Sequence, residues 1–419
     1  MGDKHMKKDR KKLIKKVKNE RGAITAMVLA SLLVIAIVLI NLYMMGSNKS
    51  NSQDKEIKMI EEAYNSGEDK TDLEYKESIV FENINTADTN PKEALPSNIK
   101  EIVENDANKG IVIKDNNDNE WVWVEVPKTT AFSGLNIDTT STLTVQNYTD
   151  IANKMITYAG VYRNGSANQN CTWTDEWYDG CGLTQQEYIN AYQSMLKYVY
   201  NYGGFWIGRY EAGIDGSITD LSNARTSSSS RIVIGTSPKA ISQKDAIPYN
   251  YITCSEAQKL ANEMTPDSNY RTSLLFGIQW DLTCKFLEVK SDLNVEDINS
   301  ASGVWGNYAN KARRITSDGA KQTKATNIAW KTIMTSKPAL TLLLSTGASD
   351  ENKMINIYDF AGNEWECTLE KSDSHGEYFT IRGGGYFNPD NDNPASYRHN
   401  VDSIKNDSDI SFRPTLYKK

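Results

Sequence analysis

Histidine and cysteine are scarce in this sequence. The 419 residues include only three His and five Cys, dispersed along the chain, which leaves little material for a zinc or haem site. Ten Pro and 26 Gly are too few for a collagen-like chain, and the 39% of hydrophobic residues and 24% of charged residues exclude wholly disordered and all-membrane proteins. A net charge of −7 disfavours a general nucleic-acid binder. The length predicts one large or two ordinary domains with a core of normal size.

The charge is distributed unevenly along the chain. Residues 1–22 carry ten Lys/Arg and three acidic residues, a local charge of +7, so the other residues together carry −14. Residues 23–45 contain no charged residue and no proline. As a helix they would be about 34 Å long, enough to span a hydrocarbon core of about 30 Å. We therefore expect a basic cytoplasmic segment or leader, a single transmembrane helix, and a C-terminal part outside the cell membrane.

Three interpretations of this N-terminal region compete. A cleaved secretory signal would have a shorter apolar core than residues 23–45. A plain signal anchor fits every feature. The third is suggested by residues 20–25, ERGAIT, which resemble a prepilin-like leader with Gly22 at the cleavage position and an apolar helix after it. Prepilins usually carry Glu five residues past the cut, where this chain has Met27.

Residues 46–118 are polar and show no periodicity that predicts a fold. Residues 55–64 could prolong the membrane helix, because Ile57, Ile60 and Ala63 follow a helical spacing. We expect the remainder to be a flexible stalk or linker that raises the next domain above the membrane.

The remaining residues, 119–419, have the pattern of an irregular α+β domain. Runs of β-forming residues and capping-box patterns predict strands and helices, in chain order, at 120–127 (strand), 184–199 (helix), 203–211 (strand), 253–264 (helix) and 279–287 (helix). Further along, turns and short strands predominate. A few amphipathic helices among many short strands and long loops are typical of the α+β class.

Several motifs occur in a specific order in this domain. They are WVWVEVP (121–127), FWIGRYE (205–211), YDFAGNEWE (358–366), RGG (382–384) and FRP (412–414). This order resembles the formylglycine-generating enzyme (sulfatase-modifying factor) family over roughly residues 119–417. The resemblance implies an irregular, elaborated C-type lectin-like fold behind the transmembrane helix.

The resemblance also implies a calcium site. In the family, an acidic or amide side chain, two backbone carbonyls and a closing Glu bind Ca²⁺, at positions that correspond here to Asp359, Gly362, Glu364 and Glu366. Carboxylates and carbonyls are the hard oxygen ligands that calcium prefers. The alternative is that Asp359 and Glu366 only cap a turn or form salt bridges. Arg413 is expected to pair with an interior carboxylate and to fix the last strand.

The family's copper-dependent oxidase activity is not expected here. It needs two Cys shortly after the RGG motif, and no Cys follows Cys367. Cu(I) requires soft thiolate ligands, so we expect no copper and no enzymatic activity. Other catalytic motifs are absent, and His375 and His399 lie in loop-like sequence without an obvious partner.

The cysteines fit an exported protein. Cys171 and Cys181 flank a polar loop that they could close as a disulfide, and two free thiols are the alternative. Cys254, Cys284 and Cys367 are expected to be small buried residues.

The stretch between Arg382 and Phe412 is rich in Asn, Asp, Ser, Tyr and His. Solvated loops have this composition, and so do ligand-binding surfaces that combine rigid aromatic with adaptable polar side chains. It also resembles the variable segment of diversity-generating retroelement target proteins, in which mutagenesis of Asn codons yields these residue types on a C-type lectin fold. The ligand-binding, variable positions that the resemblance implies are Tyr386, Asn388, Asp390, Asn391, Asp392, Asn393, Tyr397, His399, Asn400, Asp402, Ser403, Asn406, Asp407 and Asp409.

These features together predict a membrane-anchored, non-catalytic adhesin or receptor on a bacterial surface. Its expected partners are the membrane, through the N-terminal helix, and an extracellular protein or glycan on a cell, host or phage; nucleic acid is not one. The main alternative is a minor pilin or pilus-tip subunit, and pilus or homo-oligomer assembly is open in either case. A residual formylglycine-generating-type oxidase, which would turn over substrate with copper, is the third possibility.

Overall fold

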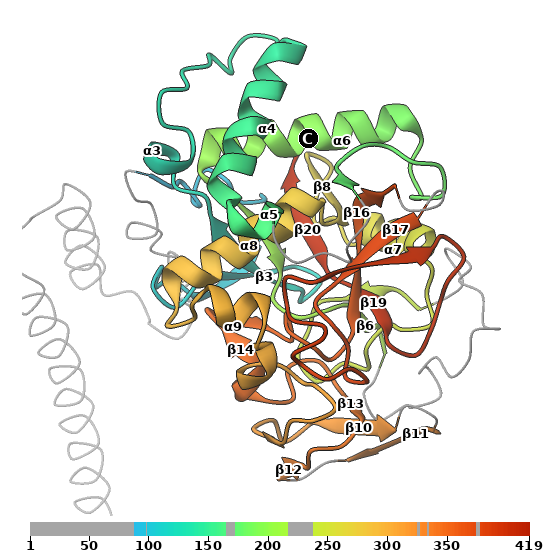
Figure 1. The fold of residues 1–419 in the computed structure, drawn as a ribbon. Coiled ribbons are helices and arrows are strands. Elements are labelled where there is room, and N and C mark those ends of the chain that lie inside the picture. The colour runs from blue at the N-terminus through green and yellow to red at the C-terminus, as the bar shows by residue number, and fades with distance from the viewer. Residues whose placement is uncertain are drawn as a thin grey trace, which may run out of the picture. The chain divides into compact units, whose positions relative to one another are not determined.

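The computed structural model describes residues 88–97, 99–164, 172–216, 238–324, 327–332, 335–373 and 378–419 (Figure 1). The chain divides into two units, Met1–Lys76 and Glu77–Lys419, and every described residue belongs to the second. No helix among the described residues is long and apolar enough to cross a membrane. The basic segment, the apolar run 23–45 and most of the predicted stalk lie outside the described residues.

The first large sheet has six antiparallel strands, and the C-terminal strand of the chain lies inside it. In spatial order these strands are β1 (Ile99–Glu104), β2 (Val112–Asp115), β3 (Glu120–Glu125), β5 (Gly204–Gly208), β20 (Pro414–Lys418) and β8 (Tyr270–Leu274). β3 and β5 are almost wholly buried because aromatic and branched residues cover both of their faces. Both correspond to predicted strands, which are thereby confirmed.

The prediction that residues 46–118 form a stalk is wrong for its last part. β1 pairs with β2 and β2 pairs with β3, so the folded domain begins before residue 119. Asp115 ends β2 as a buried residue, and its carboxylate accepts hydrogen bonds from the indole of Trp121 at 3.0 Å and the backbone N–H of Asn119 at 3.0 Å. The sequence pattern did not predict β1 because β1 is an edge strand whose glutamates are exposed or half-buried, so it lacks an alternation of apolar and polar residues.

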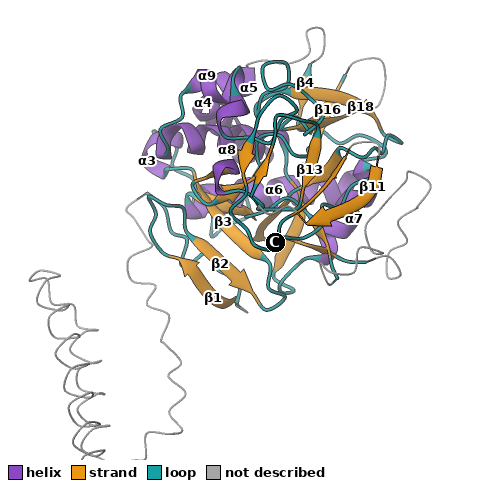
Figure 2. Ribbon diagram, turned by 90° about the horizontal axis from the view of Figure 1, so that it is seen from below, coloured by secondary structure: helices purple, strands orange, loops and turns teal. Residues whose placement is uncertain are grey.

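Three helices begin at capping boxes, in which the side chain of the N-cap threonine accepts from the backbone N–H three residues later and the side chain of that later residue accepts from the N-cap N–H. The predicted helices are confirmed as α6 (Gln185–Tyr202), α7 (Cys254–Glu263) and α8 (Gly277–Lys290). α4 (Val145–Ala159) was not predicted. Figure 2 shows α4 and α8 gathered with three short helices at one end of the domain, namely α3 (Lys128–Ala131), α5 (Val161–Asn164) and α9 (Val295–Asn299).

The second large sheet carries the motifs of the C-terminal third of the chain. It consists of β18 (Arg398–Asp402), β17 (Tyr378–Arg382), β16 (Trp365–Ser372) and β19 (Ile410–Phe412), with β4 (Trp173–Thr174) added to β16. β19 runs parallel to β16, whereas the other pairs are antiparallel. Short sheets complete the described domain: β6 (Gly213–Ile214) with β7 (Ala240–Ile241), β9 (Arg313–Arg314) with β12 (Ser336–Lys337), β14 (Lys353–Met354) with β15 (Ile357–Tyr358), and β10 (Lys321–Lys324) between β11 (Asn327–Thr332) and β13 (Leu342–Leu344). Mixed helices and sheets of this kind define an α+β fold.

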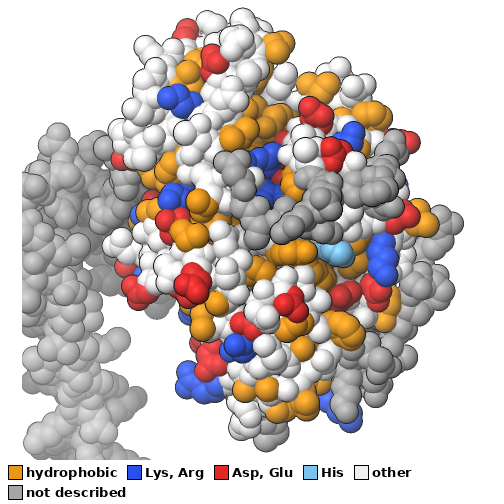
Figure 3. All heavy atoms as spheres, viewed as in Figure 1, with side chains coloured by type: hydrophobic (Ala, Val, Ile, Leu, Met, Phe, Trp, Pro, Cys, Tyr) orange, Lys and Arg blue, Asp and Glu red, His pale blue; other side chains and the backbone are white. Residues whose placement is uncertain are grey.

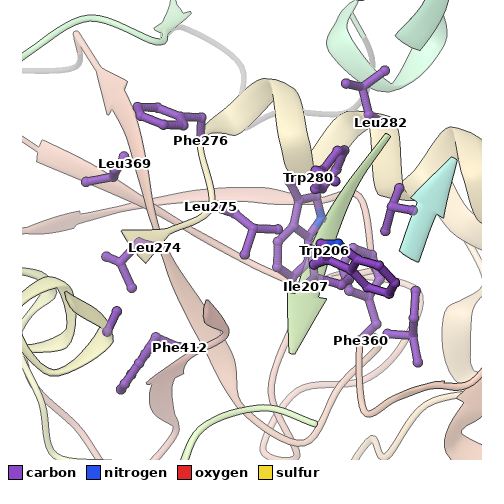
Figure 4. Packing of buried hydrophobic residues seen from close by; sticks show 14 of the residues in the cluster. Trp206, Ile207, Leu274, Leu275, Phe276, Trp280, Leu282, Phe360, Leu369 and Phe412 are labelled. Atoms are coloured by element: carbon purple, nitrogen blue, oxygen red, sulfur yellow. The ribbon is translucent and has the colours of Figure 1, made fainter. Parts of the chain in front are cut away.

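Aromatic side chains join α8, the two large sheets and the YDFAGNEWE motif into one core. Trp280 of α8 stacks on Phe360 with ring centroids 4.1 Å apart, and Trp123 and Trp206 of the first sheet lie 4.9 Å apart. Figure 4 shows Trp280, Trp206, Phe360 and their aliphatic neighbours packed together. The core therefore fixes the segment 358–366, from which the second sheet starts.

Candidate functional site

Buried ion pairs hold both ends of the loop 383–397. β17 ends at Arg382 and β18 begins at Arg398, and both side chains are buried. Both guanidinium groups pair with Asp281 of α8 and with Glu370 of β16; the Arg382 pairs measure 2.8 and 3.1 Å. These charge-assisted bonds fix the two residues between which the loop runs.

The end of the candidate segment is fixed in the same way. Arg413 follows β19 and donates hydrogen bonds to both carboxylate oxygens of Glu366, the shortest at 2.6 Å. The same guanidinium also donates to the carbonyls of Gly208 (2.9 Å) and Tyr358 (2.8 Å). The expectation that Arg413 pairs with an interior carboxylate and fixes the last strand is confirmed. We call residues 383–409, which lie between these anchors, the C-terminal segment.

The aromatic ring of Trp365 contacts residues of the C-terminal segment. The Trp365 indole N–H donates to Oδ1 of Asn388 at 2.9 Å, and the Trp365 ring lies 5.5 Å from His399 and 6.1 Å from Tyr397. Burial and the Lys405 cation lower the pKa of His399. The ring is therefore a neutral imidazole at pH 7, with one donor and one acceptor nitrogen.

Two of the predicted ligand-binding residues are buried. The Tyr386 hydroxyl lies 3.3 Å from Oγ of Ser408, and Asp390 accepts hydrogen bonds from the Gly303 N–H (3.1 Å) and the Asn310 amide (2.8 Å) and pairs with Lys311 at 3.2 Å. Their predicted role on a ligand-facing surface is therefore wrong, because composition does not distinguish a buried polar residue from an exposed one. The other twelve candidates are exposed or half-buried: Asn388, Asn391, Asp392, Asn393, Tyr397, His399, Asn400, Asp402, Ser403, Asn406, Asp407 and Asp409.

The C-terminal segment also exposes two large apolar side chains that were not predicted. Phe387 is 57% exposed and Ile404 is 77% exposed. The sequence could have indicated both residues, because each is an apolar residue within a polar stretch. Figure 3 shows hydrophobic side chains gathered on this side of the molecule between charged ones.

The side chains of the implied calcium set do not fit one calcium site. Glu366 is paired with Arg413, and the Asp359 carboxylate accepts hydrogen bonds from the Gly347 N–H (2.7 Å) and the Asn352 amide (3.2 Å). Gly362 is at positive φ (72°) in the turn, and Glu364 is buried. The described residues contain no group of three or more His, Cys, Asp or Glu that could hold a metal ion. The alternative interpretation, a cap and a salt bridge, describes Asp359 and Glu366.

Of the two cysteines of the predicted disulfide, the structure describes only Cys181. Cys181 is a buried free thiol whose Sγ lies 3.5 Å from the Leu183 carbonyl oxygen, and Cys171 lies outside the described residues. Cys254, Cys284 and Cys367 are buried free thiols, which confirms the prediction made for them.

No family model matches this sequence, and no curated protein matches it. Among solved structures, the chain is similar to Treponema denticola variable protein 1, with 12% identity over 52% of this chain and 85% of that one and a TM-score of 0.31. It is also similar to CarF, with 13% identity over 52% of this chain and 87% of that one and a TM-score of 0.29. Both similarities are distant.

Proposed function

We propose that this protein is a non-catalytic binding protein and that its C-terminal segment is the ligand-binding face of a C-type lectin-like domain. The observation that carries the proposal is the pattern of burial along the segment. Arg398 and Val401 are buried, whereas the candidate positions next to them in sequence are half-buried or exposed. This separation suits a surface on which framework residues hold the backbone and the others contact a ligand.

The chemistry of the surface favours a large, mixed ligand. Amide, carboxylate and hydroxyl groups can adapt their hydrogen bonds, while Tyr397, His399, Phe387 and Ile404 offer aromatic and apolar contact. An extracellular protein or glycan on a cell, host or phage presents both kinds of group. For its display we propose that the apolar run 23–45 anchors the chain in a bacterial cell membrane with the domain outside.

A search of the genomic DNA tests whether the surface is diversified. We expect a second, near-identical copy of the DNA that encodes Arg382 to Arg413, which differs at adenines and lies beside a reverse-transcriptase gene. Among isolates, substitutions should occur at the twelve accessible candidates and spare Tyr386, Asp390 and Arg398. Substitutions at those three residues, or identical segments in every isolate, would count against diversification and leave a fixed binding face.

A further inference from the structure

The polar loop that follows β4 lies beside the C-terminal segment. Trp173 of β4 pairs with Ser372 of β16, and Ser372 also pairs with Tyr378 of β17. Tyr378 in turn pairs with Asp402, the last residue of β18. β4 and the end of β18 therefore belong to the same end of the second sheet, and Figure 2 shows β4, β16 and β18 at one corner of the domain. We call residues 175–182, which follow β4, the β4–α6 loop.

The β4–α6 loop contacts the C-terminal segment at Gly180. A Cβ atom at Gly180 would lie 3.3 Å from the Cβ atom of Ser403, and Gly180 has a positive φ (91°). The preceding residues of the two chains, Asp179 and Asp402, are both exposed. Because successive Cα atoms are 3.8 Å apart, the Cα atoms of Asp179 and Asp402 lie no more than about 14 Å apart. One ligand can therefore contact both side chains.

The buried ion pairs that hold the C-terminal segment also hold the β4–α6 loop. The Asp175 carboxylate pairs with Arg163 at 3.0 Å. Arg163 also pairs with Asp281 at 3.2 Å and with Glu370 at 2.8 Å. Asp281 and Glu370 are the acids that bind the two arginines at the ends of the loop 383–397. The β4–α6 loop and the C-terminal segment therefore share one base, which fixes their relative position.

Short-range contacts make the β4–α6 loop rigid as well. The Trp177 indole N–H donates to the Leu183 carbonyl at 2.9 Å. A Cβ atom at Gly182 would lie 2.9 Å from the Ser255 carbonyl oxygen, so the loop packs on α7 with no side chain between them. A loop held in this way loses little conformational freedom when a ligand binds to it.

Exposed acids without a cationic partner occur in both parts of this surface. The β4–α6 loop contains three acidic residues and no Lys or Arg. Glu176 and Asp179 are exposed and form no ion pair within the described part of the chain, and the same holds for Asp402. Lys405, the exposed cation of the C-terminal segment, is paired with Asp407 at 3.0 Å. The combined surface is therefore negative and complements a cationic group on a ligand.

We propose that Asp179 is a specificity-determining residue of the ligand-binding face and that, together with Asp402, it selects ligands that present a Lys or Arg side chain. This inference rests on the proposed function. Ile404, which is 77% exposed and two residues from Asp402, offers an apolar contact beside the two acids. Lys and Arg combine an apolar stem with a charged head group. The ligand is therefore a basic protein surface, and a neutral or acidic glycan fits the face less well.

The position of Asp179 in the sequence has a consequence for a diversified surface. Asp402 lies between Arg382 and Arg413, in the segment whose codons would vary, whereas Asp179 lies outside it. Asp179 would therefore stay constant while Asp402 changes, and each variant would keep part of the preference for a cationic ligand.

A peptide selection on the full chain in detergent tests the proposal. A phage-displayed library of random dodecapeptides is selected separately on the wild type, on D179N and on the control D292N, in which an exposed acid outside both parts of the surface is changed. We expect the wild type and D292N to enrich peptides that carry Lys or Arg beside an apolar residue, and D179N to lose this preference. Asparagine keeps the oxygen that accepts from the Gly180 N–H at 3.1 Å, so D179N should fold normally.

Calorimetric titration then measures the coupling between Asp179 and the cation of the peptide. One peptide selected by the wild type is compared with a version in which its Lys or Arg is replaced by Met. We expect D179N to bind the cationic peptide about three- to tenfold more weakly than the wild type does. The affinity for the Met version should be the same for both proteins, and F387S/I404S should bind neither peptide.

The outcomes separate this inference from the proposed function. Selected peptides without Lys or Arg, or a loss on replacing the cation that is equal in the wild type and D179N, would overturn the inference and leave the binding function standing. Binding that F387S/I404S retains would place the peptide outside the C-terminal segment and overturn the inference as well. If the wild type selects no peptide, the ligand is not a basic protein surface, and binding to glycans and particles decides the proposed function.

Discussion

The guanidinium of Arg413 binds the carboxylate of Glu366 through Nε and Nη2, with the closest contact at 2.6 Å and both side chains buried. The two residues belong to the FRP and YDFAGNEWE motifs, 47 positions apart in sequence. Their ion pair joins the start of β16 to the residue between β19 and β20, and thereby connects the two large sheets.

Breaking this pair should strongly destabilise the fold. R413M leaves Glu366 buried without its partner, and removal of one member of a buried pair typically costs about 3–5 kcal/mol. The double variant R413M/E366M should recover part of that loss, because it leaves no buried charge. Urea unfolding measures the free energy of unfolding of the single and the double variant. The exposed pair of Lys405 and Asp407 is the matched control, and K405M should change the free energy of unfolding by less than about 1 kcal/mol.

Asp390 and Asp392 should respond differently to the same substitution. D390A removes the acceptor for two hydrogen bonds and the partner of Lys311, and we expect a loss of about 2–4 kcal/mol. Asp392 is exposed, so D392A should stay within about 0.5 kcal/mol of the wild type. Chemical denaturation of D390A and D392A measures the change in the free energy of unfolding for each. Equal effects would mean that burial does not separate framework from accessible positions in this segment.

Lys337 should make stability depend on pH. Burial, and secondarily the Arg313 cation, lower the pKa of Lys337 to about 7, and its amine donates to the carbonyls of Tyr308 and Lys311 at 2.7 Å each. Two N–H donors are what a neutral amine provides. In the unfolded chain this lysine stays protonated up to about pH 10.4. Between about pH 7 and pH 10.4 the unfolded state therefore binds more protons than the folded state.

The contribution of Lys337 to stability therefore rises as the pH increases from about 7 towards 10, and it is lost as the pH falls back to 7, by at most about 1.4 kcal/mol per pH unit. The free energy of unfolding of the wild type and of K337M is measured by urea unfolding at pH 7, 8 and 9. In the difference between the two proteins, the contributions of the other titrating groups cancel. A difference that does not change with pH would contradict the assigned pKa.

Local patterns predicted the helices better than the strands. Thr184 with Glu187 and Thr253 with Glu256 are contiguous capping signals, and both open helices at those residues. α4 escaped prediction because its capping box uses Asn147 in place of the usual Glu or Gln. β1 escaped because an edge strand can be polar and is stabilised by a neighbour remote from its own sequence pattern.

The amino-acid composition predicted the candidate site, and the burial of its residues in the structure corrected that prediction. Composition located the C-terminal segment but could not separate Tyr386 and Asp390 from their accessible neighbours, since partners such as Gly303 come from distant parts of the chain.

The most direct test of the central claim compares four exposed apolar residues. Phe387 and Ile404 lie in the C-terminal segment, while Leu340 (56% exposed) and Val145 (77% exposed) match their exposure elsewhere on the domain. The full chain, F387S/I404S and L340S/V145S are each assayed for binding to an extracellular glycan array and to intact bacterial, host and phage particles. The account predicts that the wild type and L340S/V145S bind the same target and that F387S/I404S loses at least tenfold in affinity. Equal binding by all three proteins, or no binding by the wild type, would contradict a ligand-binding role for this surface.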